Sequence, residues 1–347
     1  MLYEQRDLPI FQNKMYDSIN DAISSPRGDM CLVEDLDTGL VRNAAFKPEL
    51  MIYDRSYQNE QAVSRSFQEH LDNVAKIILN TMGRSELVEV GCGKAFFLEK
   101  LLSDGVEITG FDPAYEGANP RVRREYFQPG SGIEAKGLIL RHVLEHIPDP
   151  VAFLDQLKQA NGNQGKIYIE VPCFDWICQR RAWFDIFYEH VNYFRLSDFH
   201  RIFGNVISSG RIFGGQYLFV VAELSSLRQP VIDETDRADL PDDFTRKLDG
   251  LDKSNHEPAL IWGGASKGVI FSLLRTRAGL PVKAVIDINP AKQGKYLPIT
   301  GLQVVAPQDV LPDLPAGSNI YVMNRNYLDE IKQMSNNAYT YIEVDHD

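Results

Sequence analysis

Short apolar runs alternate with helical patterns along most of the chain. Residues 87–90, 106–111 and 137–140 are three apolar runs of strand length. Between the first two runs, apolar residues recur at helical spacing over 97–102. Strands that alternate with helices are typical of a mostly parallel sheet covered by helices on both faces. The pattern therefore predicts an α/β fold with a doubly wound parallel sheet.

The same pattern predicts where a central domain begins and ends. One helical face is formed by apolar residues at spacings of four, three and four: Phe67, Leu71, Val74 and Ile78. Later runs at 166–171 and 215–222 are typical of sheet strands. We therefore expect the central domain over residues 67–224, after a small N-terminal domain, 1–66, that shows no clear period.

A second α/β unit is expected at the C-terminal end of the chain. Residues 225–255 are polar and acidic, which is typical of a linker. Beyond them, residues 260–268 read as a strand, a glycine turn and the start of a helix. Further strands are expected at 282–287, at 320–323 and at 339–344. The segment 256–347 is thus predicted to be a small Rossmann-like domain.

The glycine turn after residues 87–90 is the first candidate for chemistry. Gly91 and Gly93 leave no Cβ where a ligand approaches the backbone, and the turn points N–H groups above the strand. Glu89 precedes the glycines and suits a ligand with a positive amino group. Asp112 ends the next strand, 19 residues after Gly93, where an acid can accept from ribose hydroxyls. A dinucleotide fingerprint needs a third glycine at position 96, which is Phe96 here.

The motif E-x-G-x-G formed by these residues resembles motif I of class I S-adenosylmethionine (SAM) methyltransferases. Residues 141–148, with the sequence RHVLEHIP, resemble the segment that follows the fourth strand in that family. The resemblance implies a Rossmann-like methyltransferase core with SAM as cofactor. It also implies that Arg141 and His142 contact the cofactor, together with Glu89, Gly91, Gly93 and Asp112. The alternative is an ordinary βα turn in another α/β protein.

The second glycine turn leaves three interpretations open. Gly263, Ala265 and Gly268 nearly match G-x-G-x-x-G, and Asp287 follows at a suitable distance. This pattern is compatible with a nicotinamide dinucleotide. It is also compatible with glycines that let a helix pack closely on a strand. A third interpretation is a turn that binds the phosphate of a nucleotide-linked substrate.

An aromatic-rich segment at 183–194 contains an adjacent acid and histidine, Glu189 and His190. Loops beyond strand ends are where open α/β sheets place ligands. A histidine can remove a proton near neutral pH, and a carboxylate beside it can orient its ring. The alternative is that both side chains only form hydrogen bonds within an aromatic insertion.

The run YEHxxYF at 188–194 looks like the signature of SAM-dependent sugar C-methyltransferases, which act on nucleotide-linked keto-sugars. That family has a small N-terminal domain, a SAM domain and a C-terminal Rossmann-like domain, as expected here. The resemblance implies that His190 is the general base and Glu189 its partner. It further implies that His146 and Tyr57 belong to the active site.

Two positions depart from the family pattern. The family usually has a tyrosine two residues before the glutamate, and this chain has Phe187. The family's N-terminal domain usually holds zinc through four cysteines, whereas residues 1–66 contain only Cys31 and no histidine. A closed structural zinc site needs about four such ligands, so no metal is expected.

The implied reaction is C-methylation through an enolate. A ketone acidifies the neighbouring C–H, His190 takes that proton, and the carbanion attacks the sulfonium methyl group. O- or N-methylation of another small metabolite is the first alternative. A nicotinamide-dependent oxidoreductase and a non-catalytic binding protein are the others.

The composition limits the classes of binding partner that the chain is expected to have. The 347 residues carry a formal net charge of −12, which argues against a general nucleic-acid or anionic-membrane surface. No apolar run approaches the about 20 residues of a membrane helix, and the N-terminus lacks a signal-peptide pattern. We expect a cytoplasmic enzyme with a small-molecule substrate, and the oligomeric state stays open.

Overall fold

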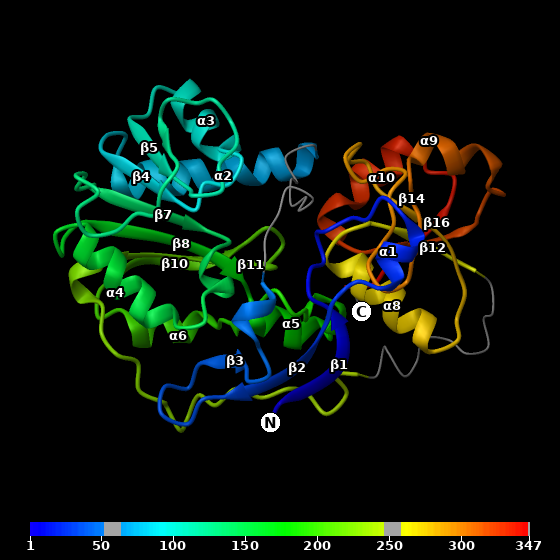
Figure 1. Cartoon of the computed structure of the whole chain (residues 1–347), viewed down its shortest axis with the longest axis horizontal. Helices are drawn as coiled ribbons and strands as arrows, with labels where there is room; N and C mark the ends of the chain where they lie inside the picture. The colour runs from blue at the N-terminus through cyan, green and yellow to red at the C-terminus, as the bar shows by residue number, and fades with distance from the viewer. Residues whose placement is uncertain (52–63, 246–257, 346–347) are drawn as a thin grey trace.

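The computed structural model describes residues 1–51, 64–245 and 258–345. Three sheets organise this part of the chain, with four, seven and five strands. Figure 1 shows the seven-stranded sheet and its helices at the left and the five-stranded unit at the right. The N-terminal strands lie along the bottom of this view. The predicted doubly wound α/β fold is confirmed.

The central sheet has its strand order reversed around β4, as a doubly wound sheet requires. From edge to edge its strands are β10 (Val206–Ile212), β11 (Tyr217–Glu223), β8 (Lys166–Pro172), β7 (Gly137–Arg141), β4 (Leu87–Val90), β5 (Ile108–Phe111) and β6 (Val122–Arg123). The five strands from β8 to β6 are parallel, and β11 and β10 are added antiparallel. Because β4 pairs with both β5 and β7, the loops after these strands diverge and leave space for a ligand.

Helices cover this sheet and carry the expected apolar faces. They are α2 (Arg65–Met82), α3 (Phe96–Ser103), α4 (Pro150–Ala160), α5 (Phe174–Arg180) and α6 (Leu196–Ile202). The face of α2 predicted from residue spacing is buried. No helix within the described ranges is long and apolar enough to cross a membrane.

The C-terminal unit is a parallel sheet, as predicted. Its strands, in order, are β14 (Val304–Val305), β13 (Val282–Ile286), β12 (Ala259–Trp262), β15 (Asn319–Val322) and β16 (Thr340–Glu343). Its helices are α8 (Lys267–Arg277), α9 (Pro307–Val310) and α10 (Leu328–Met334). The two-residue strand β14 was not predicted, since a pair of valines gives too short a pattern.

The N-terminal segment links the two units. Its strands are β1 (Tyr3–Pro9), β2 (Arg27–Glu34) and β3 (Val41–Asn43), and the fourth strand of their antiparallel sheet is β9 (Asn192–Tyr193). Between β1 and β2 the chain forms α1 (Ile19–Ile23), which lies beside the C-terminal unit in Figure 1. The aromatic segment that carries His190 is therefore held by the N-terminal sheet.

Short 3-10 helices complete the described structure: η1 (Pro48–Leu50), η2 (Leu144–His146), η3 (Trp183–Asp185), η4 (Leu224–Ser226), η5 (Leu311–Asp313) and η6 (Arg325–Tyr327). One of them joins the two α/β units. Trp183 of η3 stacks on Phe271 of α8 with ring centroids 5.7 Å apart, and both side chains are buried. This contact ties the aromatic segment to the C-terminal unit.

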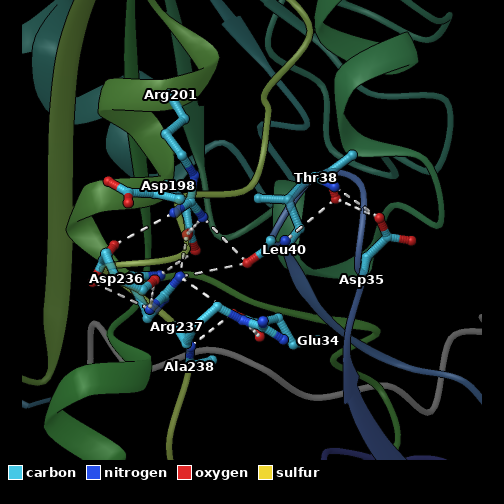
Figure 2. Close-up of polar contacts among 12 residues, drawn as sticks. Glu34, Asp35, Thr38, Leu40, Asp198, Arg201, Asp236, Arg237 and Ala238 are labelled. Atoms are coloured by element: carbon cyan, nitrogen blue, oxygen red, sulfur yellow. Dashed lines mark hydrogen bonds and ion pairs between the residues drawn. The ribbon is translucent and has the colours of Figure 1, made fainter.

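The acidic linker is anchored to the N-terminal sheet by ion pairs, drawn in Figure 2. Asp198 of α6 is fully buried between Arg195 and Arg201, and both arginines also reach Asp236 in the linker. Glu34 of β2 accepts hydrogen bonds from the next two linker residues, at 2.6 Å each. The acidic composition that predicted a linker thus includes a carboxylate that fixes its course.

Candidate active site

A cavity of about 370 Å³ lies where the three parts of the chain meet. One side is the glycine turn between β4 and α3. The other side is the glycine turn between β12 and α8, and the loops after β7 and β8 form the wall between them. The cavity therefore lies beyond the carboxyl ends of the parallel strands, as expected for an open α/β sheet.

The turn after β4 has the geometry of a ligand cradle. Gly91 and Gly93 have φ of 72° and 53°, a region that favours glycine. A Cβ at Gly91 would lie 2.6 Å from Val143 Cγ2. Asp112 Oδ2 accepts from the Gly93 N–H at 2.8 Å, and its Oδ1 accepts from the Ala114 N–H at 2.8 Å. Asp112 is thus held beside the turn.

Glu89 is buried at the floor of this turn, with 3% of its surface exposed. Burial raises the pKa of its carboxyl to about 7, and the nearby Arg141 guanidinium limits the rise. Its Oε2 atom has no hydrogen-bond partner among the described residues. A positively charged amino group in the cavity would supply that partner.

Arg141 and His142 line the same cavity, but their hydrogen bonds run to buried acids. Arg141 Nε donates to Glu170 Oε2 at 2.9 Å, and its guanidinium lies 4.6 Å from the ring centroid of Phe97. His142 lies between Glu145 Oε1, 3.3 Å from Nδ1, and Glu170 Oε1, 3.4 Å from Nε2. Burial opposes its charge, yet these two carboxylates raise the pKa of His142 to about 9.

Glu170 organises these side chains and was not predicted from the sequence. It lies in the centre of β8 with no exposed surface. The only signal in the sequence is an acid at position 170 inside an otherwise apolar strand. Lys and Glu are almost never fully buried unless paired, so such a position indicates a specific partner.

His146 and His190 are brought together at the wall of the cavity. Their ring centroids are 4.9 Å apart in an edge-to-face arrangement. His146 Nδ1 is 2.8 Å from the backbone oxygen of Glu189, so Nδ1 carries the proton of this hydrogen bond. The side chain of Glu189 is buried, and Asn13 donates to its Oε2 at 3.5 Å.

His190 has the properties of a proton acceptor. It is 8% exposed and contacts the Phe187 ring at a centroid distance of 4.1 Å. Burial, followed by the nearby His146 and His142, holds the pKa of His190 well below its usual range. The imidazole is therefore neutral near pH 7. Its Nδ1 has no hydrogen-bond partner within the described ranges.

Tyr57, which the family resemblance places in the active site, lies outside the described residues. The ligand atoms of Glu145, His146 and His190 lie within 4.8 Å of one another. Two imidazoles and a carboxylate could hold a transition metal, and the same groups could serve in acid–base chemistry. The expectation of no metal stays a prediction.

The turn after β12 has a packing role at one glycine. A Cβ on Gly268 would lie 1.7 Å from the carbonyl oxygen of Gly263, so only glycine fits. Asp287 accepts from the backbone N–H groups of Gly264 and Asn289 at 2.9 and 2.8 Å. It repeats the arrangement of Asp112 in the central domain.

The N-terminal segment covers part of this second turn. The Ser266 N–H donates to the Gln12 carbonyl at 3.3 Å and is not available to a pyrophosphate. Lys267 lines the cavity and is 6% exposed, with its Nζ 3.3 Å from Asp185 Oδ2 and 4.6 Å from the Trp176 ring centroid. These contacts argue against a dinucleotide and leave a buried ammonium facing the cavity.

Solved structures similar to this chain include the N-methyltransferase NodS from Bradyrhizobium japonicum WM9. Its identity is 14%, the match covers 46% of this chain and 96% of that one, and the TM-score is 0.33. A SAM-dependent methyltransferase from Archaeoglobus fulgidus has 17% identity, coverage of 45% and 93%, and a TM-score of 0.36. The protein PH0226 from Pyrococcus horikoshii OT3 has 12% identity, coverage of 51% and 98%, and a TM-score of 0.38. Similarities with such low sequence identity and TM-score say nothing about the reaction of this protein.

A family described as "Methyltransferase domain" matches residues 53–206. Comparison with curated proteins gave no match. The matched residues contain β4 and its glycine turn, β5 with Asp112, and the segment with His146 and His190. This part of the chain is therefore a class I, SAM-dependent methyltransferase domain.

Proposed function

We propose that the enzyme transfers a methyl group from SAM to a carbon atom of a nucleotide-linked keto-sugar, and that His190 removes the proton. The observation that carries this proposal is that a single cavity joins the glycine turn after β4 to a neutral, buried histidine. A methyl donor and a proton acceptor can then meet over one substrate carbon.

The cofactor half of the proposal rests on four residues of the central domain. The Glu89 carboxylate would bind the amino group of SAM, and the Asp112 carboxylate would accept hydrogen bonds from the ribose hydroxyls. Gly91 and Gly93 allow the cofactor to approach the backbone between them. When bound, SAM supplies an electrophilic methyl group on sulfur.

The part of the proposal that concerns the methyl acceptor depends on removal of a substrate proton by His190. His190 takes the proton from the carbon beside the ketone, and the electron pair moves to the ketone oxygen as an enolate. Bound SAM would supply the methyl group for the enolate carbon and would leave as the demethylated cofactor. Phe187 offers no hydroxyl to the enolate oxygen. His146 can donate from Nε2 only as its cation, because Nδ1 already donates to Glu189.

The nucleotide end of the acceptor is assigned to the C-terminal unit. Lys267 and Lys292 both line the cavity and are 6% and 5% exposed. An ammonium attracts phosphate strongly where water is excluded. Each ammonium is paired with an aspartate of the same lining, Lys267 with Asp185 at 3.3 Å and Lys292 with Asp287 at 3.6 Å, and a substrate phosphate would share these ammonium groups with the aspartates.

A second candidate is O- or N-methylation of a small metabolite in the same cavity. It is favoured by the same neutral histidine, which can also accept a proton from a hydroxyl or an ammonium group. The fate of the substrate's C–H proton distinguishes the two reactions.

The first prediction concerns the two equivalent aspartates. Asp112→Ala removes the acceptor of the ribose hydroxyls and should weaken SAM binding by roughly 1.5–3 kcal/mol, about tenfold to a hundredfold. Asp287→Ala is the matched control, because it removes the same backbone contacts from the other turn. Titration calorimetry measures both. Equal affinity in wild type and Asp112→Ala rejects this placement of SAM.

The second prediction concerns pH. Because burial raises the pKa of Glu89 to about 7, the empty site holds a protonated carboxyl below that pH. SAM affinity should therefore increase from about pH 6 to about pH 8, and binding near pH 7 should release a proton. Calorimetry in buffers of different ionisation enthalpy detects that proton. Glu89→Gln should remove both effects, and their persistence in this variant contradicts the assignment.

The third prediction concerns the general base. His190→Ala should retain SAM affinity and lower kcat by ~10²–10⁴-fold, because proton removal is lost. Glu189→Gln should lower kcat less than His190→Ala does, since it keeps the shape of the side chain. His200→Ala, an exposed histidine on α6, is the control. The assay is exchange of solvent deuterium into the keto-sugar in the presence of the demethylated cofactor.

Two results would contradict this assignment. Exchange at the wild-type rate in His190→Ala means that another group is the base. Loss of wild-type activity after dialysis against a chelator, with recovery on adding a divalent metal, means that His190 and its neighbours Glu145 and His146 bind a metal instead. Methylation on oxygen or nitrogen, without any exchange in the wild type, favours the second candidate function.

The fourth prediction concerns the acceptor's phosphates. Lys267→Met should raise the KM for the nucleotide-linked sugar by about tenfold or more, since a charge-assisted hydrogen bond is lost. Lys267→Arg keeps the charge and should retain part of the affinity. SAM affinity should not change in either variant. Lys283→Met, an exposed lysine on β13, is the control, and an unchanged KM in Lys267→Met refutes the phosphate contact.

A further inference from the structure

Glu170 has four hydrogen-bond or ion-pair partners, although the proposed chemistry does not use it. His70 Nε2 lies 2.7 Å from Oε1, and Arg141 Nε donates to Oε2 at 2.9 Å. The Tyr168 hydroxyl donates to Oε2 at 3.2 Å, and His142 Nε2 lies 3.4 Å from Oε1. These partners come from α2, β7, β8 and the loop after β7. One carboxylate therefore connects the covering helix to two strands of the sheet.

Glu170 itself is behind the cavity wall, and two of its partners form that wall. Arg141 and His142 line the cavity, whereas His70 and Tyr168 are buried behind it with Glu170. Burial opposes ionisation, yet Arg141, followed by the two histidines, holds the pKa of Glu170 well below its usual range. The carboxylate is thus ionised near pH 7 and pairs with the cations around it.

Arg141 lies between the carboxylates of Glu170 and Glu89, but it forms a hydrogen bond only with Glu170 among the described residues. It donates to Glu170 at 2.9 Å, while Glu89 Oε2 has no hydrogen-bond partner within the described ranges. Arg141 follows Ile139 by two residues in β7, and Ile139 pairs with Glu89 of β4, so the Arg141 and Glu89 side chains lie on the same face of the sheet and both line the cavity. The guanidinium accordingly opposes the rise of the Glu89 pKa. If Glu170 were neutral, the guanidinium would be drawn to the remaining buried anion, which is Glu89.

We propose that Glu170 is a positioning residue for cofactor binding: it retains the Arg141 guanidinium so that the Glu89 carboxylate stays available to the amino group of SAM. Glu170 touches neither cofactor nor substrate and acts through Arg141. This inference rests on the proposed function in one respect, the assignment of the SAM amino group to Glu89.

Glu170→Gln is the direct test. It keeps the shape of the side chain and removes its charge, so that Arg141 pairs with Glu89 and competes with SAM. The dissociation constant of SAM, measured by calorimetry, should increase by about tenfold or more, as for loss of a charge-assisted hydrogen bond. An unchanged dissociation constant in this variant overturns the proposal.

A double-mutant cycle separates this role from a merely structural one. Glu170→Gln with Arg141→Gln removes the competing guanidinium and should bind SAM more tightly than Glu170→Gln alone. Distant or purely structural effects would instead add, so that the double variant binds more weakly than either single one. Additive losses therefore contradict the proposal.

Asp198→Asn is the matched control for general destabilisation. Asp198 is also a fully buried carboxylate with two arginine partners, but it does not line the cavity. This variant should lower the melting temperature and leave SAM affinity within about twofold of wild type, since distant sites act independently. A SAM affinity that falls as far as in Glu170→Gln assigns the effect to lost stability and overturns the proposal.

Two further variants cover the remaining outcomes. If Glu170→Gln does not fold, Glu170→Asp keeps the charge and shortens the side chain. It should weaken SAM binding because the bond to Arg141 is stretched, and wild-type affinity in it refutes the proposal. Glu89→Gln tests the underlying assignment separately: if it binds SAM as the wild type does, the proposed cofactor placement fails, whatever Glu170 does.

Discussion

The position of β4 between β5 and β7 is the constraint on which the site depends. Parallel pairing on both sides brings the carboxyl ends of three strands to one edge of the sheet. The chain leaves β4 toward one neighbour and later returns to the other, so the loops that follow must separate. Glu89 and Arg141 line the cavity because they lie at or near these strand ends, and Asp112, which follows β5, is held beside the glycine turn.

Charge is the second organising factor. The cavity and the layer behind it contain several ionised side chains away from water, which is tolerated only when each is paired. Glu170 with Arg141 and the histidines forms one such group, and Lys267 with Asp185 forms another. In both, a paired cation lines the cavity wall. Because Arg141 forms its hydrogen bond with Glu170 and not with Glu89, the Glu89 carboxylate can bind a cationic ligand.

The segments outside the methyltransferase domain complete the cavity. The N-terminal sheet takes β9 as its fourth strand and so fixes the end of the segment that contains Glu189 and His190. Trp183 packs the other end of that segment on α8 of the C-terminal unit. The proposed base is therefore held from two sides, which limits the movement of a group whose distance to the substrate governs the rate.

The sequence by itself determined the doubly wound core, four of the five strands of the C-terminal unit and the two glycine turns. These follow from local spacing: apolar periods, glycines that permit positive φ, and an acid one strand later. It also indicated His146 and His190, because each lies in a short motif. Only the tertiary structure decided which side chains meet. Glu170 and His70 are 100 positions apart, and Gln12 reaches Ser266 across most of the chain, so no local pattern reports either contact. The neutral state of His190 likewise depends on burial and on neighbours from other segments, which packing alone establishes.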